Sequence, residues 1–280
     1  MNRVESIYLE PDKVLSSLCH LAKNLYNEAN YIVRQEFVKN GKWIRYYDLC
    51  KQLIRSENYR TLPSHTAQQA LRNLDFAWKS FFNSIKAWKT TPDKYRARPR
   101  LPHYLNKDGE YVLAFTKQQI KVKNGVVKFP KKMSREVKTR LNDDTKVKWA
   151  RIVPQGVGYQ LEIVCEKEVP DPPKKKPKRI AGIDLGVNNL VTVATNIRGV
   201  DPIVVKGGIA KSWNQWYNKE SARLKSVYDH QKNGIGKRLK LLGVKRKHRL
   251  KDYFHKTSRA VIEWCSKNRI DTIVIGRNKG

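Results

Sequence analysis

The residues best suited to chemistry lie in residues 180–195, where a single carboxylate, Asp184, stands in the middle of an apolar run. An ionised carboxylate flanked by core residues has to be paired with a cation or bound to a metal, because burying an unpaired charge is costly. Carboxylate oxygens suit hard divalent cations such as Mg²⁺. A second interpretation stays open, in which Asp184 caps a turn or pairs with a basic side chain, since structural ion pairs are commoner than sites.

The elements that position Asp184 are predicted to be a strand, a tight turn and a second strand. Strand-forming residues lie on both sides of Gly186, Asn188 and Asn189, which supply the turn. A third strand, two long helices and a returning buried-type strand are then predicted over residues 202–205, 211–231, 237–268 and 270–276. This order is that of an RNase H-like core, in which a carboxylate on the first strand lies near acids from later elements.

The charge balance points to a polyanion as the partner. The chain has 58 Lys and Arg against 25 Asp and Glu, a formal net charge of +33. That excess is far more than solubility needs and favours nucleic acid. No apolar run of about 18 residues occurs, and the N-terminus lacks the apolar region of a signal peptide, so no membrane is expected and a cytoplasmic protein is predicted. The scattered cysteines indicate neither a disulfide framework nor a zinc site within the chain; they are Cys19, Cys50, Cys165 and Cys265.

The first 90 residues are predicted to form one strand and then a helical unit. Weak alternation within residues 1–10 indicates the strand. Apolar residues then recur at helical spacing, which predicts helices over residues 13–40, 46–55 and 64–88. The helical unit therefore spans residues 11–90.

Downstream of this unit the chain is predicted to build a small antiparallel barrel. Its boundary is marked by prolines and arginines that are incompatible with a continued helix. Short strands separated by turn signals fill residues 91–170. The strand in residues 1–10 is expected to join this barrel, which makes the helical unit an insertion. Residues 171–179 form a stiff, basic, Pro-rich linker; a nuclear localisation signal is the less favoured interpretation.

Residues 182–190, GIDLGVNNL, resemble the first RuvC motif of the TnpB proteins, the transposon-encoded RNA-guided DNA endonucleases related to type V CRISPR effectors. The resemblance extends through residues 252–259, similar to the family's D-x-x-H-K-x-S-R helix, and through residues 271–280. The helical insertion in a small barrel is similar to the family's recognition and wedge domains. The implied fold class is α+β multidomain: a wedge-like barrel with a helical-bundle insertion, then an incomplete RNase H-like RuvC domain over residues 180–280.

The resemblance also implies chemistry and partners. Asp184 is the position of the family's first catalytic metal ligand, for Mg²⁺. The implied partners are a guide RNA derived from the transposon end and a double-stranded target DNA. In such recognition the protein holds the backbone while base pairing reads the sequence.

Two departures from the family pattern bear on cleavage. In many members the returning strand ends in Glu, the second catalytic acid, where this chain has Gly276; part of the family carries Gly here and takes its Glu from further downstream. The sequence ends at Gly280, ahead of the family's relocated Glu, zinc element and final catalytic Asp. Of the nearest substitutes, Asp271 begins a strand, and Asp201 and Glu263 match no motif. Since two-metal hydrolysis needs several carboxylates, we expect that the 280-residue chain does not cleave DNA, that Mg²⁺ needs the complete set, and that zinc belongs to the missing segment.

Two basic segments are predicted to contact nucleic acid. Residues 237–251 carry eight Lys or Arg and no acid, and such a helix gains affinity for a phosphate backbone by releasing counterions; a solvated helix face is the alternative. Residues 94–104 interleave Tyr with Arg, a mixture suited to stacking on bases while holding phosphates; a loop whose tyrosines pack beneath the barrel is the alternative. The predicted contact residues are Lys94, Arg96, Arg98, Arg100, Lys237, Arg238, Lys240, Lys245, Arg246, Lys247, Arg249, Lys256 and Arg259.

Other side chains of the two long helices are expected to be structural. Phe254 is expected to pack inward while Lys256 and Arg259, about one helical turn apart, face nucleic acid. His255 is expected to be a hydrogen-bonded structural histidine. The periodic aromatics of the first helix are more typical of a core than of a stacking platform; they are Trp213, Trp216 and Tyr217.

Three functions follow in order of preference. The first is part of a TnpB-like RNA-guided DNA endonuclease that does not cleave as this chain. The second is a non-catalytic RNA-guided DNA-binding protein, a repressor-like protein or a decayed remnant, because a basic protein can grip a heteroduplex without cutting it. A structural RNA-binding protein of ribosomal type ranks last, since it leaves Asp184 unexplained.

Overall fold

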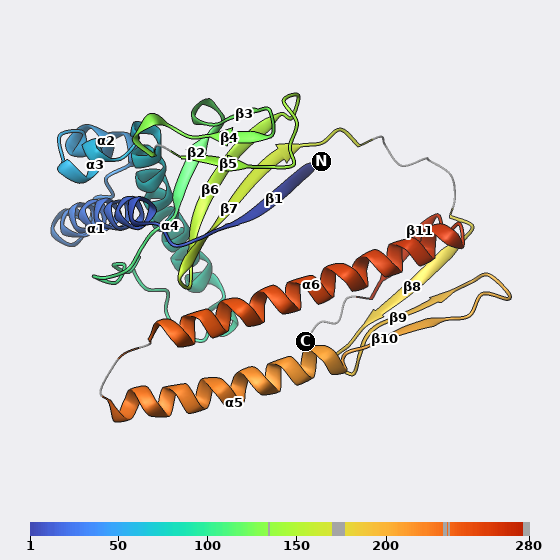
Figure 1. The fold of residues 1–280 in the computed structure, drawn as a ribbon. Helices are drawn as coiled ribbons and strands as arrows, with labels where there is room; N and C mark the ends of the chain where they lie inside the picture. Colours follow the sequence, from blue (N-terminus) through green and yellow to red (C-terminus); the bar gives the residue numbers. More distant parts are fainter. Residues whose placement is uncertain (134, 170–176, 232–233, 235, 277–280) are drawn as a thin grey trace. The chain divides into compact units, whose positions relative to one another are not determined.

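The computed structural model describes residues 1–133, 135–169, 177–231, 234 and 236–276 (Figure 1). These residues fall into two compact units, Met1–Val169 and Pro170–Gly280, which are described separately. Most of the predicted linker, residues 171–176, lies outside the described residues. Helices are combined with several sheets in a mixed α/β architecture. None of the helices in the described ranges is both long enough and apolar enough to cross a bilayer.

The first unit is built on a four-stranded antiparallel sheet whose order is β1-β7-β6-β2. β1 lies along β7, from Asn2 opposite Glu166 to Leu9 opposite Tyr159, so the helices that follow β1 in the chain are an insertion between two strands of one sheet. Gly156, with φ of 68°, closes the β6–β7 hairpin in a left-handed conformation that favours glycine. The strands are β1 (Asn2–Leu9), β2 (Leu113–Thr116), β6 (Val147–Gln155) and β7 (Gly158–Glu166).

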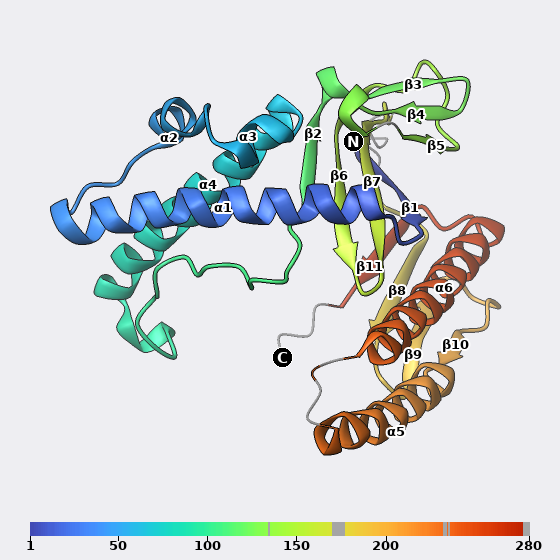
Figure 2. The same ribbon diagram turned by 60° about the vertical axis from the view of Figure 1, so that its left-hand side comes forward.

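A second, three-stranded antiparallel sheet with the order β3-β4-β5 completes the β structure of this unit (Figure 2). The hydrogen-bonded strands thus form two sheets of four and three strands in the described residues, and a closed barrel stays a prediction. One short 3₁₀ turn follows the last inserted helix, and two others lie between strands. The elements are β3 (Lys121–Lys123), β4 (Val126–Lys128) and β5 (Glu136–Lys138), with the 3₁₀ turns η1 (Pro92–Lys94), η2 (Lys117–Gln119) and η3 (Lys131–Met133).

The first inserted helix is capped at both ends. Asp12 accepts a hydrogen bond from the backbone N–H of Leu15 (2.8 Å), and Gly41 ends the same helix with φ of 63°. Three helices lie close to the predicted ranges, whereas a five-residue helix between the second and the last was not predicted. The helices are α1 (Lys13–Asn40), α2 (Tyr46–Leu53), α3 (Glu57–Thr61) and α4 (Ser64–Thr90).

One continuous core joins these helices to both sheets of the first unit. Trp78 of α4 is fully buried, and its ring meets the rings of Phe37 and Phe81 edge-on at centroid distances of 5.4 and 6.0 Å. Phe115 of β2 and Ile163 of β7 supply the sheet side of the core. Burial of this many large apolar side chains stabilises the insertion and the sheet as one body.

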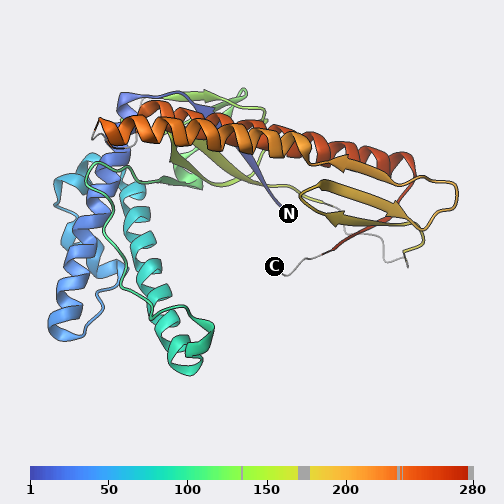
Figure 3. The same ribbon diagram turned by 90° about the horizontal axis from the view of Figure 1, so that it is seen from below.

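The second unit is a four-stranded sheet, order β10-β9-β8-β11, with two helices. β11 returns parallel to β8 and the other pairs are antiparallel. The two helices lie side by side (Figure 3), and Val261 and Cys265 of the second pack on Ala181 and Ile183 of β8. The elements are β8 (Ile180–Leu185), β9 (Asn189–Thr195), β10 (Ile203–Lys206), α5 (Gly208–His230), α6 (Lys237–Lys267) and β11 (Thr272–Ile275).

Only one face of this sheet is covered among the described residues, which corrects two expectations. The returning strand was expected to be of a buried type, yet Val274 and Ile275 are more than half exposed. Phe254 was expected to pack inward, yet its side chain is 46% exposed; Thr257 takes the buried position on α6 instead. Apolar periodicity alone did not show whether Phe254 or its neighbour Thr257 lies on the buried face of α6.

Candidate nucleic-acid interface and carboxylate site

Asp184 lies on β8, opposite Thr192 of β9, with its side chain on the exposed face of the sheet. Strand alternation explains this position, because Ala181 and Ile183 point to the opposite, buried face. The carboxylate forms no hydrogen bond or ion pair with any residue that the structure describes. Burial therefore does not force Asp184 to be paired, as the apolar run had suggested, and the carboxylate stands open to solvent and available as a ligand.

The end of β11 lies beside Asp184. The backbone N–H of Gly276 donates to the carbonyl of Ile183 (3.0 Å), one residue beyond the pairing of Ile275 with Ile183. A Cβ built on Gly276 would meet that carbonyl oxygen at 3.7 Å, an ordinary contact. Position 276 is where the resemblance to TnpB proteins places the second catalytic acid of many members. In this structure it lies next to Asp184 and has room for a side chain.

The other acids considered as substitutes are differently placed. Asp271 accepts the backbone N–H groups of Lys178 and Arg179, both at 3.1 Å, and these hydrogen bonds lower the pKa of its carboxyl group. Glu263 is paired with Arg259 at 2.7 Å. Within the described ranges no three residues among His, Cys, Asp and Glu form a group that could hold a metal ion. Among the described residues, the carboxylate site therefore consists of one exposed acid.

The helix segment that resembles the family motif carries local ion pairs. Lys256 pairs with Asp252 at 2.8 Å and Arg259 with Glu263 at 2.7 Å, each one turn apart on α6 and largely exposed. Such pairs contribute little to stability and exchange readily with another anion. His255 is exposed and has no hydrogen bond with a described residue, so the expected structural hydrogen bond is absent there.

The basic part of α6 contains two kinds of cation: arginines that contact side chains of α5, and cations whose side chains are exposed to solvent. Arg246 donates from Nε to Oδ1 of Asn214 (2.7 Å) and stacks over Tyr217, with 4.9 Å between its Cζ and the ring centroid. Arg249 stacks over Trp213 and Trp216, at 5.4 and 5.7 Å. These contacts tie the two helices together through cation–π interactions. The remaining predicted contact residues of this segment are exposed: Lys237, Arg238, Lys240, Lys245 and Lys247.

The second predicted segment presents Lys94, Arg96, Arg98 and Arg100 to solvent. Arg98 stacks over Trp88 of α4, with its Cζ 5.8 Å from the ring centroid. The chain continues as an extended strap, residues 101–111, that runs along α1. The four exposed cations precede this strap in the chain, and the strap is held by hydrogen bonds to α1 from Pro102 onward.

A polar stripe on α1 holds this strap by its carbonyl groups. Asn30, fully buried, accepts from Nε1 of Trp78 (3.1 Å) and donates to the carbonyls of Pro102 (3.1 Å) and His103 (3.3 Å). Its neighbours on the helix, spaced three or four residues apart, bond carbonyls of the strap or the Glu110 carboxylate, as one face of a helix allows. Among them, Arg34 donates to the same Pro102 carbonyl (2.8 Å). The other members of the stripe are Ser16, His20, Lys23, Asn27 and Arg34.

A groove of about 620 Å³ between α4 and strands β2 and β6 was not predicted from the sequence. It combines exposed rings, cations and amides: Phe76 is 57% and Trp149 39% exposed, Arg151 stacks on Trp149 at 5.6 Å, and Arg72 stacks on Tyr46 at 4.8 Å. The amides of Gln69 and Asn73 lie one helical turn apart on the same wall. The sequence signal for it was the pair Trp149 and Arg151 on one strand face.

These side chains suit nucleic-acid bases better than an apolar ligand. Exposed aromatic rings stack on bases, amide side chains hydrogen-bond base edges, and arginines hold phosphates. Two of the cations have partners already, since Arg151 pairs with Glu162 at 2.6 Å and Lys148 with Glu166 at 3.2 Å. The arginine is thereby oriented while its ring partner stays accessible.

Residues 162–280 match the OrfB_IS605 family, described as a probable transposase. The chain is also 25% identical, over 255 aligned residues, to the TnpB-like protein ORF457 of Acidianus two-tailed virus, an alignment that covers 79% of this chain and 53% of that protein. The chain thus spans about half the length of that relative. The matches support a TnpB-family protein, and the resemblance seen in the residue motifs is confirmed.

Two solved structures align with most of this chain at low sequence identity. A CRISPR-Cas12f ternary complex aligns with a TM-score of 0.38 and 13% identity, covering 94% of this chain and 62% of that one. A Cas12f1-sgRNA-target DNA complex aligns with a TM-score of 0.47 and 13% identity, covering 95% of this chain and 65% of that one.

Proposed function

We propose that this chain is the nucleic-acid-binding portion of a TnpB-like RNA-guided DNA endonuclease associated with a transposon. Its partners are a guide RNA from the transposon end and double-stranded target DNA. The observation that carries the proposal is the groove between α4 and β6, where exposed rings, arginines and amides are combined within the first unit. The guide RNA and the target DNA are proposed from the resemblance of residues 182–190 and 252–259 to the TnpB proteins, a resemblance that the family match and the TnpB-like relative support.

Asp184 is proposed as one ligand of a divalent cation. Mg²⁺ is usually bound through one or two carboxylates and several waters, and hydrolysis with two cations needs further acids. The described residues offer Asp184 without a second carboxylate beside it, so they do not fit a complete Mg²⁺ site and no metal-dependent step is derived for this chain. Zinc likewise has no group of ligands in the described residues.

The second candidate, a non-catalytic RNA-guided DNA-binding protein, is favoured by the same isolation of Asp184. For the 280-residue chain both candidates give the same expectation, binding without cleavage. Incubation of the chain with guide RNA, Mg²⁺ and a matched duplex tests this directly. Cleavage that is lost on Asp184→Ala would overturn the non-cleaving part of the proposal and show that this carboxylate finds its partners elsewhere.

Binding is tested by fluorescence anisotropy with RNA from the transposon's own end and with a scrambled RNA of the same length. The native RNA should bind more tightly. The variant Phe76→Ala/Trp149→Ala should weaken binding by about 1–3 kcal/mol for each stacked base that is lost. Tyr31→Ala, which removes a ring that is also 57% exposed but lies on α1 outside the groove, is the matched control and should bind like the unmodified chain. Equal affinity for native and scrambled RNA would contradict the guide-RNA assignment.

A further inference from the structure

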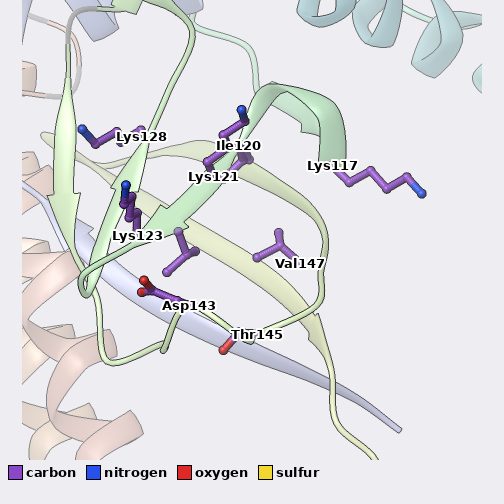
Figure 4. A pocket seen from close by; sticks show the side chains of 9 residues that line it. Lys117, Ile120, Lys121, Lys123, Lys128, Asp143, Thr145 and Val147 are labelled. Carbon is purple, nitrogen blue, oxygen red and sulfur yellow. The ribbon is translucent and has the colours of Figure 1, made fainter.

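The three-stranded sheet of the first unit has one apolar face and one basic face. Val122, Val127 and Val137 share the inner face and pack against the core. The alternate residues of β3 and β4 point outward, and among them are Lys121, Lys123 and Lys128. These lysines line a pocket of about 500 Å³ together with Asp143 and Thr145 of a neighbouring loop. Figure 4 shows the lining side chains.

The lysines of this pocket are not neutralised within the protein. The side chains of Lys117, Lys121 and Lys123 form no hydrogen bond or ion pair with any described residue. Lys121 lies directly opposite Lys128 in the β3–β4 pair, an arrangement of like charges that destabilises a sheet. Lys128 has a partner in Glu136 of β5, at 3.1 Å, but both side chains are more than half exposed. The pocket therefore holds more positive charge than the fold itself requires.

The single carboxylate lining the pocket is already engaged. Oδ1 of Asp143 accepts the backbone N–H of Asn124 (2.7 Å), which holds the loop against the β3–β4 turn. The rest of the lining is the Thr145 side chain and small apolar side chains, without an aromatic ring. The Thr145 hydroxyl already donates to Oδ1 of Asn142 (3.1 Å), so the ammonium groups are the donors that a ligand would meet. A site with several ammonium groups and no ring binds phosphates rather than bases.

We propose that this lysine pocket binds consecutive phosphates of a nucleic-acid backbone, without reading bases. The volume exceeds what one phosphate group fills, and Lys117 lines both this pocket and the groove between α4 and β6. One strand can therefore place its bases in the groove and its adjoining phosphates in the lysine pocket. This assignment rests on the proposed nucleic-acid function and names the backbone contact that accompanies the base contact.

A purely protective role for the same lysines makes a different prediction. β3 is the edge strand of its sheet, and lysines on an edge discourage pairing with a second chain. If protection is their only role, replacing them by glutamine promotes self-association and leaves nucleic-acid binding unchanged. Size-exclusion chromatography of the variant measures the first effect and the salt titration below measures the second.

The test compares Lys121→Gln/Lys123→Gln with Lys39→Gln/Lys51→Gln in the full chain. The control removes the same charge from exposed lysines of α1 and α2 whose side chains form no hydrogen bond or ion pair with a described residue. Anisotropy with single-stranded RNA and DNA 12-mers at several salt concentrations gives the slope of log K against log salt. Loss of two phosphate contacts should reduce the magnitude of that slope by about 1.4 for a single strand and weaken binding about tenfold or more at 0.1 M salt. The control should leave the slope nearly unchanged.

Each outcome decides the proposal. A slope that falls only in the pocket variant supports the site, and a fall for RNA alone or DNA alone identifies the strand that occupies it. Equal slopes for the pocket and control variants overturn the lysine pocket while leaving the proposed function intact. If the unmodified chain binds neither nucleic acid, the proposed function itself fails. Thermal unfolding of the pocket variant at or slightly above the temperature of the unmodified chain confirms that it is folded, because the change removes the repulsion between Lys121 and Lys128.

Discussion

The two compact units differ in how completely their sheets are covered. In the first unit helices and a second sheet enclose a core that includes Trp78, Phe115 and Ile163. In the second unit α6 covers one face of the sheet, and the other face, which carries Asp184 and Val274, is exposed among the described residues. Because burial of apolar surface is the main source of stability, we expect the first unit to be the more stable and the second to present reactive groups.

The largest expected effect comes from the core of the first unit. Trp78→Ala removes a fully buried ring and should destabilise this unit by about 3–5 kcal/mol. Urea denaturation followed by hydrogen exchange and mass spectrometry reports each unit separately. The second unit should keep its own transition. Phe76→Ala, on the same helix but 57% exposed, is the control and should change little. Equal loss of protection in both units would show that they fold as one body and would break the comparison.

A smaller effect is expected at the polar stripe. Asn30→Leu leaves the Nε1–H of Trp78 and the carbonyl of His103 without their partner, at a cost of about 1–3 kcal/mol per buried group. The carbonyl of Pro102 keeps only its hydrogen bond from Arg34. The strap should exchange amide protons faster and be cut sooner by protease. Asn40→Leu, an exposed amide at the end of the same helix, is the matched control. An unchanged strap in the Asn30 variant would mean that its other contacts suffice.

The sequence predicted elements better than surfaces. Apolar periodicity placed α1 and α4 to within about two residues, since long amphipathic helices repeat the signal over several turns. It missed α3, because five residues are too few for a period to show. Asp184 was found as a lone acid in an apolar run, but its exposure depends on which sheet face α6 covers, a tertiary fact. The groove joins Gln69 to Trp149, residues 80 positions apart that only the fold brings together.

The open face of the second unit can be tested by adding the acid that position 276 lacks. Gly276→Glu should place a carboxylate beside Asp184 without a steric clash. Two adjacent carboxylates bind a divalent cation more tightly than one, so Mn²⁺ affinity measured by electron paramagnetic resonance should rise about tenfold, equivalent to about 1.4 kcal/mol. Gly276→Gln is the matched control. The same gain in a Gly276→Glu/Asp184→Asn protein would show that Asp184 is not part of the site.

The smallest effect on stability is expected for Asp271, which accepts hydrogen bonds from the backbone just before β8. The pH dependence of that effect shows whether the charge of its carboxylate is the cause. Backbone hydrogen bonds from Arg179 and Lys178 lower the pKa of Asp271 below its ordinary value of 3.8. A depressed pKa contributes stability above the unfolded-state value, and this is lost as the pH falls through the folded-state value. Asp271→Asn should therefore lower the melting temperature of the second unit slightly at pH 7, and the difference from the unmodified chain should vanish in acid.

Asp201→Asn is the control for that titration, since Asp201 is exposed and forms no hydrogen bond with a described residue. It should leave the melting temperature unchanged across the same pH range. A difference for Asp271→Asn that persists at low pH would assign the effect to the shape of the side chain rather than to its charge. The Asp271 carboxylate accepts hydrogen bonds from the backbone just before β8, whereas the Asp184 carboxylate, on β8 itself, has no partner among the described residues. The first acid therefore helps to hold the second unit together, and the second is left available for a ligand.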